Sequence, residues 1–418
     1  MTNSTTKISI HEDWVVVILG FLIIVLALIG VQPASPAYGW VTSAELTSKI
    51  LSSSNLLVIA IQFLFVLLIA FVGVLLTGKP IRTFFTSFSI LYIITVLALI
   101  LAGNKTIKGL NLEAVIFSLS IGLIIGNLFK LPEWFRKTLS TELFVKIGLV
   151  LLGTSIIFSD ILKAGSYGLL QALLVVISVW YFAFWLCRKL KVDQELTMMI
   201  SSAVSICGVS AAIATSGAIN GDSKKLSLVI SLVLICAIPM MIGMPYIAGW
   251  MGLSQEVTGA WLGGSIDTTG AVVASGTLVG EEALKISTIV KFSQNVLLGL
   301  AAFAISLYWT WNKKAGADAP EKPTLRVIWE RFPKFVLGFV AASLLFSFFL
   351  QPETISDVKD GLKNLQSVWF VLAFTSIGLE TNFADLVKGN NRKPLIAFLV
   401  AQLFNVIVTL IIAQMLFG

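Results

Sequence analysis

The sequence predicts an all-α polytopic membrane protein, and three observations point to this class. Hydrophobic residues make up 57% of the 418 residues and charged residues only 12%, whereas ordinary soluble domains carry about 25% charged residues. The mean hydropathy is +0.94. The apolar residues form runs far longer than the roughly ten-residue strands of a membrane barrel. We therefore expect many transmembrane helices and no large soluble domain.

Thirteen apolar runs follow one another along the chain, each about long enough to cross a bilayer core. The first run is expected to be a helix rather than a signal peptide, because Glu12 and Asp13 stand where a signal peptide carries basic residues. Two runs are rich in Gly and Ser, and each is predicted to be broken or re-entrant. The chain is thus expected to have about 11 to 13 transmembrane helices. The runs are 14–31, 56–76, 85–102, 112–129, 142–158, 167–187, 197–219 (Gly/Ser-rich), 226–248, 258–276 (Gly/Ser-rich), 285–311, 334–350, 366–384 and 394–417.

The basic residues separate the two sides of the membrane. If all thirteen runs cross, one side holds 18 Lys and Arg residues and the other holds 8. If the two Gly/Ser-rich runs re-enter instead, Lys224 and Lys225 change sides and the numbers become 20 and 6. The positive-inside rule then predicts a cytoplasmic N-terminus, a cytoplasmic loop at 312–333 and an external C-terminus. The charges slightly favour re-entry but do not decide between the two topologies.

Several classes of function are disfavoured by composition. The net charge of +7 is spread over short loops, so no basic patch for nucleic acid is expected. The single histidine, His11, precedes the first apolar run, which argues against zinc, haem and Ser-His-Asp chemistry. Cys187, Cys207 and Cys236 lack the spacing of a disulfide framework or metal site and are interpreted as packing residues. We expect no cofactor, no metal site and no enzyme activity.

Two passages resemble each other in the two halves of the chain. IGLVLLGTSIIFSDILKAG begins at Ile147 and FVLAFTSIGLETNFADLVKGN begins at Phe370. In each passage an apolar, Gly-containing helix ends in Phe, a small residue and Asp, at 158–160 and 383–385, and Leu and Lys follow. The predicted topology runs the two helices in opposite directions. This pattern is typical of the inverted-topology repeats of secondary transporters, with repeat elements near 112–187 and 334–417. A chance likeness of two Leu-rich helices is the alternative.

The two Gly/Ser-rich runs are the predicted substrate site. Small residues allow close helix packing, and an unwound segment in mid-membrane is tolerated where it faces a cavity. Such a segment exposes helix N-termini, which attract anions. Asp267 lies at the centre of the second run, and Lys291 shares a face of the next helix with Gln294 and Asn295. The alternatives are ordinary helix packing and a structural Asp267–Lys291 pair. The predicted substrate-binding residues are Ser205, Cys207, Gly208, Ser210, Gly263, Gly264, Ser265, Asp267, Thr268, Lys291, Gln294 and Asn295.

Six passages together are typical of one known family: SLSIGLIIGNLF, KIGLVLLGTSIIFSDI, SSAVSICGVSAAIAT, GGSIDTTGAVVASG, STIVKF and SIGLETNFADLVK. Through them the sequence resembles, over about residues 85–418, the YeiH-type family of bacterial inner-membrane proteins, a group described as sulfate exporters. The resemblance implies multi-pass residence in the plasma membrane, an inverted-repeat fold shared by cation/proton antiporters and anion transporters, and export of a small oxyanion. Many relatives carry His-Glu or His-Asp at Asp267 and Thr268 and a Gln at Ala271, so no imidazole role carries over. The first two helices extend the usual core, which divides the chain into an extension at 1–83 and a transporter core at 84–418.

The sequence as a whole predicts a secondary transporter or facilitator that exports a small anion, such as sulfate, a related sulfur oxyanion or a sulfonate. In this hypothesis Lys291 attracts the anion, and backbone N–H groups at 207–210 and 263–265 donate to it. Asp267 is either the charge partner of Lys291 or the protonatable coupling group. The alternatives are a sodium- or proton-coupled antiporter of the same fold and a polytopic membrane enzyme. The expected partners are the anion, the lipid bilayer and a coupling proton or sodium ion, with a homodimer left open.

Overall fold

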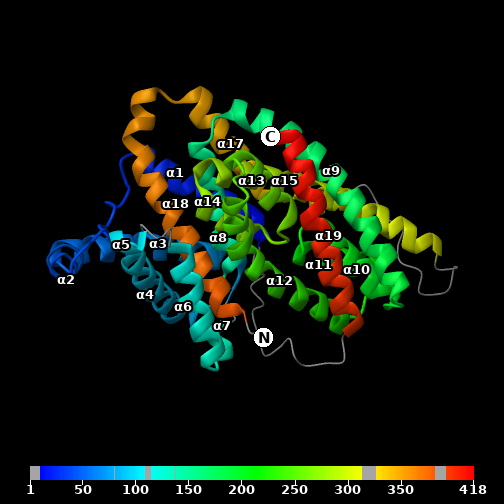
Figure 1. The fold of residues 1–418 in the computed structure, drawn as a ribbon. Helices are drawn as coiled ribbons and strands as arrows, with labels where there is room; N and C mark the ends of the chain where they lie inside the picture. Colours follow the sequence, from blue (N-terminus) through cyan, green and yellow to red (C-terminus); the bar gives the residue numbers. More distant parts are fainter. Residues whose placement is uncertain (1–9, 80, 109–113, 137, 313–325, 382–391) are drawn as a thin grey trace, which may run out of the picture. The chain divides into compact units, whose positions relative to one another are not determined.

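The computed structural model describes residues 10–79, 81–108, 114–136, 138–312, 326–381 and 392–418 (Figure 1). The described residues are mainly helical, and α-helices account for nearly every named element. The predicted all-α class is confirmed. The chain divides into two compact units, one made of Met1–Phe158 with Lys334–Asn382 and the other of Ser159–Pro333 with Phe383–Gly418.

The first unit is a helical bundle in which chain segments distant in sequence pack together. α6 and α18 approach so closely that a Cβ on Gly122 would lie 2.6 Å from the carbonyl oxygen of Thr375, while one on Gly378 would lie 2.5 Å from that of Leu119. The leading helix α1 lies inside this bundle, where Asp13 forms a 3.0 Å ion pair with Lys146 of α8. The helices of the first unit are α1 (Glu12–Leu28), α2 (Ser43–Glu45), η1 (Leu46–Ile50), α3 (Ser53–Thr77), α4 (Phe84–Ala102), α5 (Lys105–Lys108), α6 (Ala114–Leu128), α7 (Glu133–Arg136), α8 (Thr141–Leu152), η2 (Gly153–Ser155), α17 (Phe335–Leu344), η3 (Leu345–Phe349) and α18 (Pro352–Glu380).

The first passage of the predicted repeat covers the end of α8, then η2 and the start of α9, and the second covers the end of α18. Residues 382–390 of the second passage lie outside the described part of the chain. α8 and α18 pack side by side and run antiparallel. Gly148 of α8 lies against the ring of Phe370 of α18. Thr141, which precedes Gly148 in α8, interacts with Glu380, which follows Phe370 in α18. The opposite directions agree with an inverted repeat, and superposition of the two passages stays a prediction.

The second unit consists of long helices around two short helical hairpins. α9 and α19 run antiparallel along its outside, as shown by the stacked rings of Phe182 and Phe404 at 3.9 Å and the contact of Tyr167 with Phe417. The helices of the second unit are α9 (Phe158–Lys189, from Ser159 onward), α10 (Gln194–Ser205), α11 (Val209–Ile219), α12 (Ser223–Trp250), α13 (Gln255–Ser265), α14 (Thr269–Val279), α15 (Glu281–Asn312), α16 (Arg326–Arg331) and α19 (Arg392–Phe417).

Each of the two Gly/Ser-rich runs is broken into two short helices that form a hairpin. Hairpin 1, which we define as α10 and α11, returns to its own starting side, because Lys225 at the start of α12 forms a 2.7 Å ion pair with Asp193, the N-cap of α10. The backbone amide of Asp222 also donates to Glu195 at 3.1 Å. The two ends of this hairpin therefore lie at the same end of the unit.

Hairpin 2, which we define as α13 and α14, closes in the same way at the other end of α12. The amide of Ala283, in the first turn of α15, donates to the side chain of Gln255, in the first turn of α13. Gly259 and Gly263 of α13 face Ala283 and Ser287 of α15, in parallel register. Because α12 separates the hairpins, hairpin 2 enters from the end opposite to hairpin 1. This geometry agrees with the re-entrant alternative that the charges left open.

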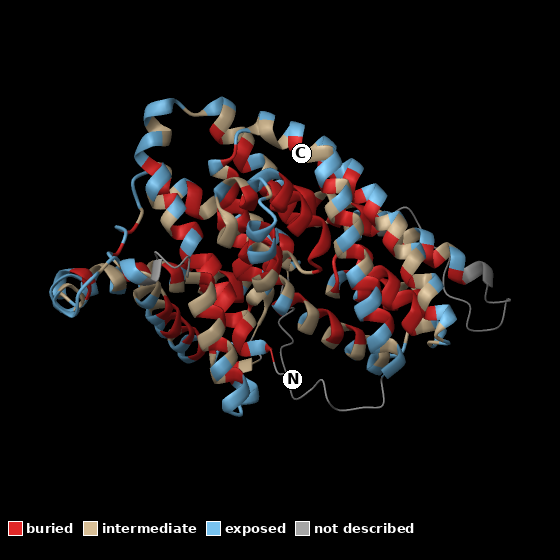
Figure 2. Cartoon of the chain, viewed as in Figure 1, coloured by how far each residue is buried: buried red, intermediate tan, exposed pale blue. Residues whose placement is uncertain are grey.

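Seven helices among the described residues are long and apolar enough to cross a membrane, and several shorter apolar helices accompany them. Figure 2 shows α13 and α14 almost wholly buried, whereas the outer helices alternate between buried and exposed residues. The exposed side chains on α9 and α19 include many Leu and Ile residues, as expected for surfaces that face lipid. The seven helices are Ser53–Thr77, Phe84–Ala102, Glu133–Ser155, Phe158–Lys189, Ser223–Trp250, Glu281–Trp309 and Arg392–Phe417.

Candidate functional site

The candidate site lies in the second unit, where the tips of the two hairpins meet. The tip of hairpin 1 is Ile206–Gly208 and that of hairpin 2 is Ile266–Thr268. Gly208 has φ +55, and a Cβ there would lie 3.0 Å from the Cβ of Asp267. Glycine is therefore required both by the backbone conformation and by the contact between the tips. The predicted breaks bring together residues that lie about sixty positions apart in the chain.

Lys291 of α15 joins the two tips. Its Nζ donates to the carbonyl oxygen of Ile206 at 2.9 Å, to that of Ile266 at 2.8 Å and to Oε1 of Gln294 at 3.0 Å. An ammonium group has three donors, so all of them are used, and the side chain is only 1% exposed. Lys291 thus binds the carbonyl groups that follow the C-terminal ends of α10 and α13, where the helix dipoles favour a cation.

Two features of this arrangement define how Lys291 can act at the site. No described contact joins Lys291 and Asp267 as an ion pair, although the two groups interact electrostatically. The lysine also has no donor left for direct attachment to an anion in this conformation. Its charge contributes to the electrostatic field of the site, while its hydrogen bonds hold the hairpins together.

Amide side chains from three long helices support the tips. Gln294 donates to the carbonyl oxygen of Gly264 at 2.9 Å, and Asn405 of α19 donates to those of Val204 and Ser265 at 3.0 and 3.2 Å. These bonds satisfy carbonyl groups left over at helix C-termini. Gln402 donates in the same way to the carbonyl oxygen of Ser265 at 2.8 Å. Gln171 of α9 donates to that of Ala260, in the middle of α13, at 2.7 Å.

Sequence reasoning missed Gln171, Gln402 and Asn405. Each is an amide within a strongly apolar run, and a polar side chain at membrane depth is the signal that could have indicated it. The three-residue spacing of Gln402 and Asn405 places both on one face of α19. Their partners lie more than 85 positions away in the chain, and only the fold reveals them.

Asp267 is buried at the tip of hairpin 2. Its side chain is 2% exposed, and no described residue donates a hydrogen bond to its Oδ2. It interacts electrostatically with Lys291, and the side chain of Gln402 lies within hydrogen-bonding reach of its carboxyl group. Burial of a carboxyl oxygen without a donor is costly, so this atom is available for a proton or a ligand.

α11 and α14 both begin at the tips, so two positive helix ends lie where the tips meet. We call this place the crossing. The first N–H groups of a helix have no intrahelical acceptor. α11 begins at Val209 without a side-chain cap, and Ser210 in its first turn is exposed. α14 is capped by Thr268, whose Oγ1 accepts from the amide of Ala271. The amides that could bind an anion are therefore those of residues 209–211 and of residues 269 and 270.

The amides of residues 263–265, which were predicted to donate to the anion, do not face the tip. Gly263, Gly264 and Ser265 form the last turn of α13, so their amides point back into that helix and their carbonyl groups face the tip. The expected donors of hairpin 2 lie a few residues later, where α14 begins. The sequence could not distinguish the end of one short helix from the start of the next.

The remaining predicted residues lie at or next to the tips. Ser205 ends α10 and donates to the carbonyl oxygen of Ser201 at 2.7 Å, while Cys207 is a buried tip residue. Asn295 donates to Oγ1 of Thr269 at 3.3 Å, and its own Oδ1 has no donor among the described residues. All twelve predicted residues thus belong to hairpin 1, hairpin 2 or the adjacent turn of α15.

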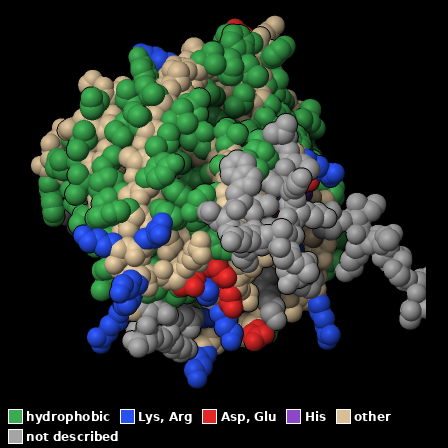
Figure 3. Space-filling model, turned by 90° about the vertical axis from the view of Figure 1, so that its right-hand side faces the viewer, with side chains coloured by type: hydrophobic (Ala, Val, Ile, Leu, Met, Phe, Trp, Pro, Cys, Tyr) green, Lys and Arg blue, Asp and Glu red, His purple; other side chains and the backbone are tan. Residues whose placement is uncertain are grey.

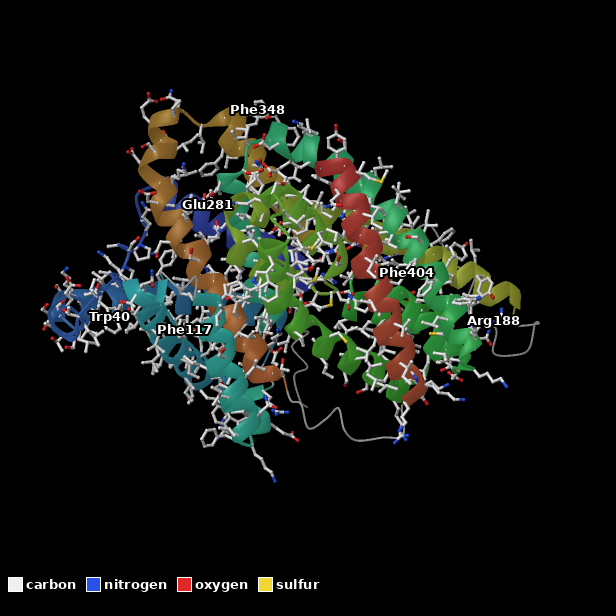
Figure 4. All side chains as sticks on the ribbon, viewed as in Figure 1. Trp40, Phe117, Arg188, Glu281, Phe348 and Phe404 are labelled. Atoms are coloured by element: carbon white, nitrogen blue, oxygen red, sulfur yellow. The ribbon has the colours of Figure 1, made fainter. Side chains whose placement is uncertain are left out.

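Basic and aromatic residues mark the end of this unit at which hairpin 1 opens. Arg188 and Lys189, which end α9, lie over the rings of Phe184 and Trp185 at 5.8 and 4.8 Å. Figure 4 shows Arg188 and Glu281 at opposite ends of the unit. Figure 3 shows a largely hydrophobic face with Lys and Arg gathered toward one edge. This distribution is typical of a membrane interface.

Asp193, at the same basic end, remains a charged cap of α10. Burial alone would raise the pKa of this carboxyl, but the hydrogen bond from Lys225 and those from two backbone amides lower it below its usual value. Asp193 is therefore ionised at neutral pH, and it keeps hairpin 1 tied to α12.

The comparisons with known proteins agree with this architecture. The sequence model of a family described as Conserved hypothetical protein 698 matches residues 86–398, which include both hairpins and α15. The chain belongs to this family. The resemblance to the YeiH-type proteins is thereby confirmed.

Similar proteins are themselves described as membrane proteins. The UPF0324 membrane protein RB9488 of Rhodopirellula baltica is 40% identical over 351 residues, which cover 81% of this chain and 64% of that protein. A UPF0324 membrane protein of Nitratidesulfovibrio vulgaris is 38% identical over 386 residues, which cover 88% of this chain and 65% of that protein. The chain thus spans less than two thirds of the length of these relatives. No solved structure matches it significantly. Together with the seven span-length helices, these relatives identify a multi-pass membrane protein.

Proposed function

We propose that the protein is a secondary transporter or facilitator that exports a small anion across the bacterial plasma membrane, with sulfate, another sulfur oxyanion or a sulfonate as the substrate class. The observation that carries this proposal is the meeting of the N-termini of α11 and α14 at the hairpin tips. Two half-helix N-termini that converge within a membrane supply backbone donors and positive dipoles for an anion. The proposal involves no chemical conversion of the substrate.

The charge of Lys291 supports an anion rather than a cation at this place. The ammonium group is fixed between the carbonyl oxygens of Ile206 and Ile266, so it already occupies the position where a mobile cation would find backbone oxygens. A second cation nearby would be repelled, whereas an anion would be attracted. The exposed Ser210 and half-exposed Thr269 supply hydroxyl groups next to the free helix ends.

The membrane potential favours the direction we propose. Movement of one elementary charge through the potential changes the free energy by about 2.3 kcal/mol per 100 mV. A dianion that leaves an inside-negative cell gains about twice that amount. Export can therefore proceed by facilitated passage, whereas uptake would require coupling to another gradient.

A second candidate is a sodium- or proton-coupled antiporter of the same fold. The observation that favours it is Oδ2 of Asp267, which is buried without a hydrogen-bond donor among the described residues. In this alternative Asp267 binds the transported cation, and anions have no effect on flux.

Flux measured with the purified protein in liposomes tests the proposal. Vesicles loaded in turn with sulfate, sulfite, thiosulfate, a sulfonate and a carboxylate should release at least one of these anions faster than empty liposomes. An inside-negative potential should accelerate the release. Sodium or proton exchange that is indifferent to every anion would select the second candidate instead.

A further inference from the structure

Two buried oxygen atoms near the crossing lack donors, and they belong to side chains that interact with each other. Oδ2 of Asp267 and Oε1 of Gln402 have no hydrogen-bond partner among the described residues, and the two side chains are 2% and 4% exposed. The Nε2 of Gln402 is already used, since it donates to the carbonyl oxygen of Ser265 at 2.8 Å and contacts Sδ of Met240 at 3.3 Å. The side chain of Gln402 also lies within hydrogen-bonding reach of the Asp267 carboxyl.

The other groups around Asp267 do not neutralise it directly. The Lys291 ammonium of α15 interacts with it electrostatically but donates its three hydrogen bonds to other oxygen atoms. The thiols of Cys236 on α12 and Cys207 at the tip of hairpin 1 are the further titratable groups that face this region. α19 contributes the neutral amides of Gln402 and Asn405.

A single proton would satisfy both orphaned oxygens. A protonated carboxyl has one O–H donor, which could be donated by Oδ2 of Asp267 to Oε1 of Gln402. The same proton removes a buried negative charge that has no ion pair. A sodium ion fits less well, because it would add a second positive charge beside Lys291 and needs more oxygens than these two.

We propose that Asp267 carries a coupling proton, held between its Oδ2 and Oε1 of Gln402, and that the proton and the transported anion bind together. This inference rests on the proposed anion transport. Protonation changes the summed charge of Asp267 and Lys291 from zero to +1, so it strengthens anion binding, and by reciprocity the anion strengthens proton binding. The proton is taken from water and returned to water, and no other bond changes. For a dianion, one net negative charge still leaves the cell with each proton.

Proton movement driven by an anion gradient tests this inference. Liposomes that contain the protein, a pH-sensitive dye and a sulfate gradient should show a proton flux in the direction of the sulfate flux. Asp267→Asn should abolish this proton flux and make any remaining sulfate flux independent of pH. Asp160→Asn, which makes the same chemical change at an ion pair with Lys285 at the end of α15, should keep both properties.

Infrared spectroscopy gives a second test that does not require transport. The wild-type protein near neutral pH should show the carbonyl stretch of a protonated carboxyl, which Asp267→Asn removes and Gln402→Leu shifts. Sulfate flux without proton flux, or with sodium flux instead, would overturn the inference. Absence of the carboxyl band would also overturn it. The presence of the band without flux of any anion would support the proton site and refute the proposed transport function.

Discussion

Lys291 acts at the scale of a single residue as a tethered cation. Its ammonium group takes the place that a free cation would occupy between two backbone carbonyl groups, and it neutralises the negative ends of α10 and α13. The positive ends of α11 and α14 then remain for a mobile ligand. Lys291 therefore fills the cation site between the two tips, and the neighbouring helix N-termini form a separate site for an anion.

Loss of Lys291 should destabilise the protein as well as stop transport. Lys291→Ala leaves the buried oxygens of Ile206 and Ile266 without donors, at a cost of about 1–3 kcal/mol for each. Lys291→Arg should not restore stability, because a planar guanidinium cannot replace an ammonium that reaches three converging acceptors. Thermal unfolding in detergent measures the effect.

Lys285→Ala is the control for this prediction, since Lys285 lies on the same helix in an ion pair with Asp160 that is partly exposed to solvent. Pairs of this kind contribute only about 0–1 kcal/mol. An unfolding temperature of Lys291→Ala equal to that of the wild type would show that the lysine does not hold the tips together.

The polar residues of the site could be predicted from the sequence, but their contacts could not. Asp267, Lys291, Gln294 and Asn295 stood out because polar groups at membrane depth are rare. Their partners depend on how two hairpins meet, and the sequence left a structural pair of Asp267 with Lys291 open as an alternative. Backbone carbonyl groups are present at every residue, so no sequence pattern indicates which of them will bind a lysine.

The hairpins explain, at the scale of elements, why small residues gather in two stretches. At Gly208 the backbone has φ +55, and a Cβ would lie 2.6 Å from Cγ1 of Val233. At Gly263 a Cβ would lie 2.5 Å from the carbonyl oxygen of Ser287. The predicted breaks at 197–219 and 258–276 therefore follow from local composition. The return of each hairpin to its starting end depends on contacts such as Asp193–Lys225, which join distant residues.

Substitution of Gly208 should disrupt the tip of hairpin 1. Gly208→Ala meets both a strained backbone and a steric contact, so we expect a loss of about 1–3 kcal/mol. Gly243→Ala in α12 is the matched control, because nothing lies within 4 Å of its Cβ position and alanine is favoured over glycine in a helix. Equal stability of the two variants in thermal unfolding would contradict the tip geometry.

Cysteine labelling tests the re-entrant course of both hairpins. In a chain without its native cysteines, Lys191→Cys and Asn220→Cys should react from one side of the membrane. Glu256→Cys and Glu281→Cys should react from the other side. These residues flank hairpin 1 and hairpin 2 respectively, and all four are exposed or half-exposed. Reaction of Lys191→Cys and Asn220→Cys from opposite sides would show that α10 and α11 cross the membrane.

The whole molecule combines a unit with a polar crossing and a unit with closely packed helices. The first unit holds the antiparallel α8 and α18 and the glycine contact of α6 with α18. The second holds both hairpins and every predicted site residue. Sequence analysis predicted the all-α class and the broken segments, because hydropathy and composition are local properties. It did not predict the division into two units, because each unit is assembled from two separate stretches of chain.

The orientation of the molecule in the membrane is a separate prediction. With both hairpins re-entrant, 20 basic residues lie on one side and 6 on the other, so we expect the end with Arg188 to be cytoplasmic. A membrane-impermeant reagent added to intact cells should label Glu256→Cys but not Lys191→Cys. In inverted membrane vesicles the accessibility should be exchanged, and labelling of Lys191→Cys in intact cells would reverse the orientation.

The central claim is that an anion binds at the free N-terminus of α11, and one variant tests it most directly. Ser210→Glu places a negative charge in the first turn of α11, where Ser210 is exposed, and an acidic residue there stabilises a helix through its dipole. We predict that Ser210→Glu unfolds at a temperature equal to or above that of the wild type, yet loses anion efflux from liposomes, while Ser210→Gln retains it. Anion efflux by Ser210→Glu at the wild-type rate would contradict the proposed site.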